Sequence, residues 1–189
     1  IVITDIEHPS VIEPAQILAE RGLCELRFCP VDKDTANVSS ERLLSVIDEN
    51  TALVCVMHAN NEVGSVNSIV ELAKAVRLKW PKLHLHVDAV QALGKLDVSF
   101  YGSGIVDSAS FSGHKVGAFK GIGALYLKNG TRFSLLLAGG GQERGRRPGT
   151  ENLPGIISFG KRCLDVQLKY SHWQETWLRF KHQYLAALQ

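Results

Sequence analysis

Short apolar runs alternate with segments of helical spacing along the first two thirds of the chain. The expected strands are short, and they cover residues 1–6, 23–31, 52–57, 83–87, 105–111 and 123–127. Helices are expected over 11–21, from Ser39 or Ser40 to about 49, and over 68–79, with Ser10 as the cap of the first. This alternation predicts an α/β fold of three layers around a mainly parallel sheet.

The pattern changes after residue 127. Residues 139–150 are dense in Gly and Arg, and a long loop of this kind is usually functional. From about 154 to 189, apolar and aromatic residues recur at spacings of three and four, among them Trp173, Trp177, Phe180, Tyr184 and Leu188. We therefore divide the chain into a large α/β part, residues 1–153, and a helical stretch, residues 154–189.

Composition narrows the classes of function. The 189 residues carry a formal net charge of +2, too small to predict nucleic-acid binding, and no apolar run reaches membrane-spanning length. The four cysteines show neither CxxC nor disulfide-framework spacing, so we expect a reducing compartment, the cytoplasm, with mitochondria as the alternative. The chain begins in an expected strand, without Met or a basic leader, and we expect it to be a segment of a longer protein.

Polar side chains gather where the expected strands end. They are His8, Asn60, Asp88, Gln91, Ser112, His114 and Lys115. Because ligands of open α/β sheets bind beyond the carboxyl ends of the strands, we expect these side chains at one edge. Lys115 is the most informative, since a desolvated lysine loses its proton more readily and its amine can then form a Schiff base. We expect Lys115 to hold an aldehyde cofactor.

The remaining polar residues suit the parts of an aromatic phosphorylated cofactor. Asp88 could pair with a protonated pyridine nitrogen, Asn60 and Gln91 could bond a phenolic oxygen, and His8 could stack on a ring or move a proton. Ser112, His114 and the Gly-rich loop with Thr150 could contact a phosphate.

Each residue alone has a simpler interpretation. Lys115 could be a solvated turn residue, Asp88 a helix N-cap, and the others ordinary loop residues. A metal site is a further alternative, because His84, His86 and Asp88 share one face of a strand. No fourth ligand appears at a suitable spacing, and we predict no metal.

Five motifs in one order give the chain a recognisable identity. They are EH at 7–8, ANNEVG at 59–64, HVDAVQ at 86–91, SGHK at 112–115 followed by KGIGALY at 120–126, and GGGQER at 139–144 with RPGTEN at 147–152. Together they resemble the cysteine desulfurase and selenocysteine lyase family, pyridoxal phosphate enzymes of the aminotransferase class V type. The resemblance covers residues 1 to about 165 and implies part of a fold type I large domain.

The resemblance assigns a role to each polar residue. It implies that Lys115 binds pyridoxal 5'-phosphate (PLP) as a Schiff base and that Asp88 pairs with the pyridine nitrogen. Asn60 and Gln91 would lie by the phenolic oxygen, and His8 would stack on the ring and act in proton transfer. Ser112 and His114 would bind the phosphate. Thr150 would reach the phosphate site of a partner subunit, because family members are homodimers.

The implied reaction removes selenium or sulfur from L-selenocysteine or L-cysteine and leaves L-alanine. Lys115 would take the Cα proton of this small amino-acid substrate, and in the family a loop cysteine passes the chalcogen to an acceptor protein. The motifs at 142–152 favour the selenocysteine lyases slightly. The alternative is a non-catalytic relative kept for partner binding.

The sequence departs from the family in three places. The family's N-terminal part and its C-terminal small domain, with the loop cysteine and a carboxylate-binding arginine, lie outside these residues. We therefore expect the 189 residues not to act alone, and we assign none of the four cysteines as the nucleophile. Gly117-Ala118-Phe119 stands where the family usually has Tyr-Gly-Pro, which would change the edge of the cofactor pocket.

Overall fold

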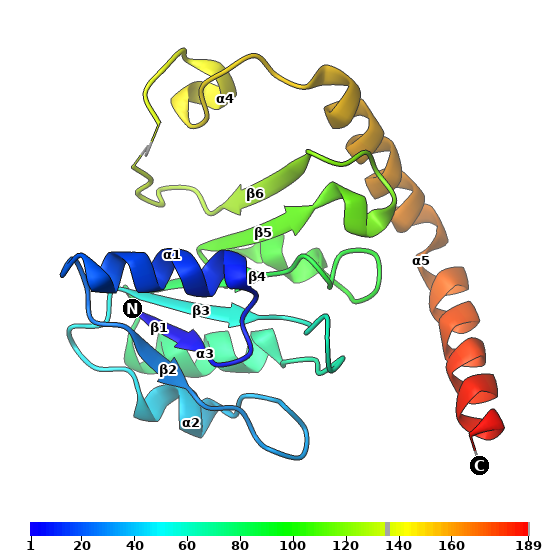
Figure 1. The fold of residues 1–189 in the computed structure, drawn as a ribbon, viewed down its shortest axis with the longest axis horizontal. Helices are drawn as coiled ribbons and strands as arrows, with labels where there is room; N and C mark the ends of the chain where they lie inside the picture. Colours follow the sequence, from blue (N-terminus) through cyan, green and yellow to red (C-terminus); the bar gives the residue numbers. More distant parts are fainter. Residues whose placement is uncertain (135–136, 189) are drawn as a thin grey trace. The chain divides into compact units, whose positions relative to one another are not determined.

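The α/β architecture is confirmed by a computed structural model that describes residues 1–134 and 137–188 (Figure 1). Its strands are β1 (Val2–Thr4), β2 (Arg27–Cys29), β3 (Leu53–Met57), β4 (His84–Asp88), β5 (Ser108–Ser112) and β6 (Gly123–Leu127). Its helices are α1 (Pro9–Glu20), α2 (Ser40–Ser45), α3 (Ile69–Lys79), α4 (Gln142–Gly145) and α5 (Leu153–Ala187), with the 3₁₀ helices η1 (Ser99–Ser103) and η2 (Gly113–Val116).

The chain forms two compact units. The sheet unit comprises Ile1–Ala92, Val98–Phe111 and Leu125–Thr131, and the helix unit comprises Leu93–Asp97, Ser112–Ala124 and Arg132–Gln189. The division proposed from the sequence, at residue 153, coincides with the start of α5 and stays a prediction.

The sheet has the strand order β2-β1-β3-β4-β5-β6. Strands β1 to β5 pair in parallel, and β6 runs antiparallel to β5, since Lys128 N–H bonds the Asp107 carbonyl at one end and Gly113 N–H bonds the Ile122 carbonyl at the other. The register sets Asp88 beside Met57 on β3 and beside Ser110 on β5. The carboxyl ends of β3, β4 and β5 therefore lie level, as the sequence predicts for a ligand-binding edge.

Helices cover both faces of the sheet and make three layers (Figure 1). On one face, α1 brings Ala15, with Val11 and Ile12 beside it, against Ile3 and Cys55. The other face is covered by α2 and α3, which bury Leu43, Ile69, Leu72, Ala73 and Val76. This split follows from right-handed crossovers, because the chain turns back across the sheet between β2 and β3.

Several predicted boundaries were wrong. The second helix ends at Ser45 and not near residue 49, and the first strand ends at Thr4 and not at residue 6. The first helix begins at Pro9 with His8 as its N-cap, because proline is preorganised for the first helical position and the His8 Nδ1 accepts the Ser10 N–H at 3.1 Å. Strand β2 is confined to Arg27–Cys29. Strand β5 begins at Ser108, because the Asp107 carboxylate takes the Leu85 N–H (2.8 Å) in place of a regular ladder bond.

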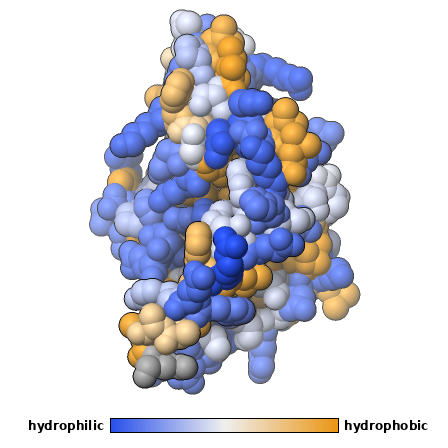
Figure 2. All heavy atoms as spheres, turned by 90° about the vertical axis from the view of Figure 1, so that its right-hand side faces the viewer, coloured by the Kyte–Doolittle hydropathy of each residue, from blue (hydrophilic) through white to orange (hydrophobic). Residues whose placement is uncertain are grey.

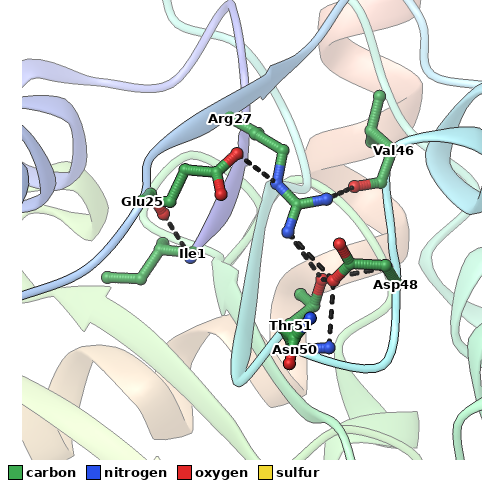
Figure 3. A network of polar contacts seen from close by, with 7 residues as sticks. All are labelled: Ile1, Glu25, Arg27, Val46, Asp48, Asn50 and Thr51. Carbon is green, nitrogen blue, oxygen red and sulfur yellow. Dashed lines mark hydrogen bonds and ion pairs between the residues drawn. The ribbon is translucent and has the colours of Figure 1, made fainter.

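A polar network centred on Arg27 fastens β2 to the loop after α2 (Figure 3). Its guanidinium donates to the Val46 carbonyl at 3.0 Å and to Asp48 Oδ1 at 2.9 Å, and it forms an ion pair with Glu25 at 3.2 Å. The hydrogen bonds from Arg27 and Thr51 lower the pKa of Asp48 to about 2. The ionised Asp48 therefore stabilises the fold above its usual pKa, and that contribution disappears as the pH falls through about 2.

Helix α5 belongs to the helix unit and confirms the helical pattern expected from about 154 onward. Its C-terminal half exposes Trp177, Leu178, Phe180, Tyr184 and Leu185. Figure 2 shows apolar residues interspersed with hydrophilic ones on the face that it draws. None of the described helices is long and apolar enough to cross a membrane.

Candidate functional site

Asp88 ends β4 as a buried acid, only 3 % exposed. Its Oδ1 accepts the Val90 N–H at 2.9 Å, and its backbone carbonyl accepts the His58 N–H at 2.9 Å. The charge of the carboxylate acts on three other groups of the sheet unit: beside the larger effect of burial, it contributes to raising the pKa of Glu7, Cys55 and Tyr101. Gln91 follows in the next turn, half-buried. A buried anion at the carboxyl end of a parallel strand is suited to a cationic ligand group.

Asn60 holds two segments of the sheet unit together. Its Oδ1 accepts the N–H groups of Glu62 (2.8 Å) and Val63 (2.9 Å), and its Nδ2 donates to the Ile6 carbonyl at 2.9 Å. The amide is thus a turn-forming group, which is the simpler interpretation offered above. These bonds also fix Asn60 next to the segment that carries His8.

His8 is exposed at the N-terminus of α1. Its Nδ1 accepts the Ser10 N–H and also lies 2.8 Å from the Ser10 Oγ. Both contacts use Nδ1, so they orient the ring and leave Nε2 directed away from the helix cap. The arrangement suits a ring that stacks on a ligand or exchanges a proton through Nε2.

Glu7 was quoted in a motif but given no role by the sequence analysis. It is 5 % exposed, and its Oε1 accepts the Thr4 hydroxyl and the Met57 N–H, both at 2.5 Å. The signal available in the sequence is an acid that directly follows an apolar strand, but its burial depends on a partner fifty residues away.

An aromatic cluster of the sheet unit is joined to Asp88 through the backbone N–H of His58, which donates to the Asp88 carbonyl. The Tyr101 hydroxyl is 2.9 Å from the His58 Nδ1, and both side chains are buried. The Phe100 and Phe111 rings pack against Tyr101, with centroids 4.5 and 5.7 Å away. Sequence analysis missed this cluster because its members come from the residue after β3, from η1 and from β5, and no local spacing links them.

In the helix unit, the SGHK motif forms the 3₁₀ helix η2. With three residues per turn, Gly113 and Val116 face inward and are buried, while His114 and Lys115 are exposed. The desolvated setting expected for Lys115 is therefore not found. The Ser112 Oγ lies 2.8 Å from the His114 Nδ1, so these two expected phosphate contacts are neighbours. Helix α5 supports the turn through Arg162, whose Nε donates to the Val116 carbonyl at 2.8 Å.

Gly113 is required by close packing inside this turn. A Cβ there would lie 2.7 Å from the Ile122 Cγ2 and 3.1 Å from the Ile122 carbonyl oxygen, which accepts the Gly113 N–H at 2.9 Å. We expect Gly113→Ala to lower the free energy of unfolding by about 1–3 kcal/mol, measured by urea denaturation, because the added methyl overpacks the turn. Gly102→Ala is the matched control, since a Cβ at Gly102 meets nothing within 4 Å. Equal stability of the two variants would contradict the packing argument.

The Gly-rich loop in the helix unit is closed by its own contacts. Gly149 N–H donates to the Gln142 Oε1 at 3.0 Å, and Thr150 next to it is exposed. Glu143 and Arg144 adopt left-handed backbone angles, with φ of 49° and 58°, inside the single turn α4. The described geometry leaves the Thr150 hydroxyl accessible to a ligand or a partner.

His84 and His86, which were considered as metal ligands together with Asp88, both contact the hydroxyl of Ser108 in the structure. The Ser108 Oγ lies 2.8 Å from the His84 Nε2 and 2.8 Å from the His86 Nδ1, so both rings share one hydroxyl. Burial lowers the pKa of His86 to about 4, which keeps that ring neutral. Over residues 1–134 and 137–188, no group of three or more His, Cys, Asp or Glu side chains could hold a metal ion.

The four cysteines are free thiols. Burial raises the pKa of Cys29 to about 11 and that of Cys55 to about 12, so both are protonated at neutral pH. Neither suits a nucleophilic thiolate.

The predicted site residues thus divide between the two units. His8, Asn60, Asp88 and Gln91 belong to the sheet unit, and Ser112, His114, Lys115 and Thr150 belong to the helix unit. The sheet unit supplies an anion, amides and an imidazole, and the helix unit supplies a primary amine with hydroxyl and imidazole donors.

Comparison with known proteins identifies relatives of this chain. It is 45 % identical over 161 residues to a cysteine desulfurase of Nostoc sp. (strain PCC 7120 / SAG 25.82 / UTEX 2576), which covers 85 % of this chain and 39 % of the relative. The cysteine desulfurase IscS of Clostridium botulinum (strain Hall / ATCC 3502 / NCTC 13319 / Type A) is 42 % identical over the same coverage. The chain therefore spans about two fifths of the length of the curated relatives it matches.

Solved structures agree with these relatives. A NifS-like protein superposes with a TM-score of 0.93 at 36 % identity, over 99 % of this chain and 51 % of its own. DndA from Streptomyces lividans superposes with a TM-score of 0.87 at 35 % identity, over 99 % of this chain and 53 % of its own. Since residues 1–186 also match the family described as aminotransferase class-V, this chain belongs to the class-V aminotransferase family.

Proposed function

We propose that the protein uses PLP to remove sulfur from L-cysteine, or selenium from L-selenocysteine, and releases L-alanine. The observation that carries the proposal is Asp88, a buried carboxylate at the carboxyl end of β4 in a chain of this family. The names of the relatives, cysteine desulfurases, favour sulfur over the slight preference for selenium suggested by residues 142–152.

The residues present fit PLP. Asp88 supplies the negative charge that a protonated pyridine nitrogen needs, and Lys115 supplies a primary amine that solvent and ligands can reach. Ser112 and His114 supply neighbouring donors for a phosphate. We assign Asn60 and Gln91 to the phenolic oxygen and Thr150 to a phosphate, the latter in a partner subunit of a homodimer.

Bound PLP supplies an electron sink for the electron pair left when the substrate loses its Cα proton. The Nζ of Lys115 accepts that proton as a general base. His8, oriented through Nδ1 by Ser10, stacks on the cofactor and can move a second proton at Nε2. A thiolate other than the four cysteines of this chain would attack the sulfur or selenium as its bond to the β carbon breaks, and would then pass the chalcogen to an acceptor protein.

The test measures products from both substrates. The full-length protein, purified and loaded with PLP, is incubated with L-cysteine or L-selenocysteine and a thiol reductant, and alanine is measured with sulfide or selenide. Equal amounts of alanine and sulfide are expected, and none without PLP. Faster turnover of L-selenocysteine would reverse the substrate preference. Bound PLP without alanine from either substrate would contradict catalysis and support a non-catalytic relative kept for partner binding.

A further inference from the structure

Glu7 is a buried acid that the proposed mechanism does not use. Both of its hydrogen bonds end on Oε1, from the Thr4 hydroxyl and the Met57 N–H. Its Oε2 is buried and has no hydrogen-bond partner. No cation among the described residues forms an ion pair with Glu7. A carboxylate with one bare, desolvated oxygen is costly, whereas a carboxylic acid with its proton on that oxygen is neutral.

The groups around Glu7 also favour the neutral form. They come from β1 (Thr4), β3 (Cys55 and Met57) and β4 (Asp88), and Asp88 is the acidic one. Burial raises the pKa of Glu7 to about 7, its two hydrogen bonds oppose that rise, and the charge of Asp88 adds to it. The charge of Glu7 in turn contributes to raising the pKa of Cys55. Two carboxyl groups in one buried region cannot both ionise cheaply, so one of them keeps the proton.

The contacts of Glu7 lie at the edge where the proposed ligand binds. Its Oε1 joins the end of β1 to the end of β3, and Met57 in turn is paired with Asp88. Its neighbours Ile6 and His8 are also held in place. The Ile6 carbonyl accepts a hydrogen bond from Asn60 Nδ2, and His8 caps α1. Glu7 thus fixes the segment that carries His8 and that is bonded to Asn60.

We propose that Glu7 is a positioning residue of the cofactor site, a protonated carboxylic acid that ties β1 to β3 through Oε1 and leaves Asp88 as the sole anion of the region. This inference rests on the proposed function for the identity of the ligand. The protonation and the tie are properties of the protein without cofactor.

The first experiment measures the proton directly. Infrared difference spectra of the cofactor-free protein, wild type minus Glu7→Gln, are expected to show the carbonyl stretch of a carboxylic acid at pH 6 and its loss by pH 8.5. Glu20→Gln is the control, because Glu20 is exposed on α1 and its difference spectrum should lack that band at pH 6. A carboxylate signal for Glu7 at pH 6 would overturn the proposal.

The second experiment measures stability against pH. A group whose pKa is raised by folding stabilises the protein fully below its unfolded value of 4.5, and that stability is lost as the pH rises through about 7. The folding equilibrium constant of wild type should therefore fall by about 10²-fold between these values because of Glu7 alone. Glu7→Gln mimics the neutral acid and should flatten this slope. An unchanged slope in the variant would contradict the assignment.

The third experiment tests positioning through PLP affinity at pH 6. Glu7→Gln should bind PLP within about threefold of wild type, and Glu7→Ala should lose at least about tenfold, because only glutamine keeps an acceptor for Thr4 and Met57. Equal affinity of wild type and Glu7→Ala would refute the positioning role. If wild type itself does not bind PLP, the proposed function fails, while the infrared and stability results still decide the protonation of Glu7.

Discussion

Replacing Lys115 by alanine is expected to abolish the cofactor absorption band near the edge of the visible range. The band requires a covalent link to a primary amine, and Lys115 is the amine of the SGHK turn. Turnover of L-cysteine should fall by at least about 10²–10⁴-fold, the usual contribution of a positioned general base, because alanine cannot take the Cα proton. Absorption spectra and alanine formation measure the two effects on the same preparation.

Two further variants separate chemistry from charge. Lys115→Arg keeps the positive charge but cannot form a Schiff base at any ordinary pH, so it should lose the band as alanine does. Lys120→Ala removes an exposed lysine of the same unit five residues later and should leave both band and turnover unchanged. A band that survives in both Lys115 variants would show that another amine holds the cofactor.

The regular elements could be predicted from the sequence because periodicity reports burial on one face. Helix α3 has almost the predicted bounds, since Leu72, Ala73 and Val76 recur at helical spacing, and strand β6 has the predicted bounds. Two boundaries differed from the prediction because of a single side chain. The Asp107 carboxylate takes the Leu85 N–H at the start of β5, and the His8 imidazole caps α1 two residues before the expected cap, Ser10.

The types of site residue could also be predicted, but their surroundings could not. Asp88 was expected to be buried and is buried, because it ends the strand β4, which lies between β3 and β5 and buries Leu85 and Val87. Lys115 was expected to be desolvated and is exposed, because a three-residue period turns Gly113 and Val116 inward instead. Glu7 was missed because its environment depends on Met57 and Asp88, which only the sheet register brings near it. Local sequence carries the chemistry of a residue, and long-range pairing determines its protonation.

Asp88→Asn is expected to lower turnover of L-cysteine by about 10²–10³-fold, the size expected when one partner of a buried charge pair is removed. The fold should survive, because the asparagine Oδ1 can still accept the Val90 N–H. The variant isolates the negative charge, which keeps the pyridine nitrogen protonated and the cofactor able to hold electrons. Asp34→Asn is the control, because Asp34 is an exposed acid in the loop after β2, and its turnover of L-cysteine should match that of wild type.

The same variant should reveal the coupling between the two acids without any cofactor. Because the charge of Asp88 helps to raise the pKa of Glu7, its removal should lower that pKa. The carboxylic acid band of Glu7 in cofactor-free protein should then disappear at a lower pH in Asp88→Asn than in wild type. If Asp88→Asn turned over L-cysteine as fast as wild type, the role of Asp88 at the pyridine nitrogen would be refuted. If the carboxylic acid band of Glu7 disappeared at the same pH in both proteins, the coupling would be refuted. The two outcomes are independent, because turnover requires PLP and the titration of Glu7 requires only the sheet unit's own buried carboxyl groups.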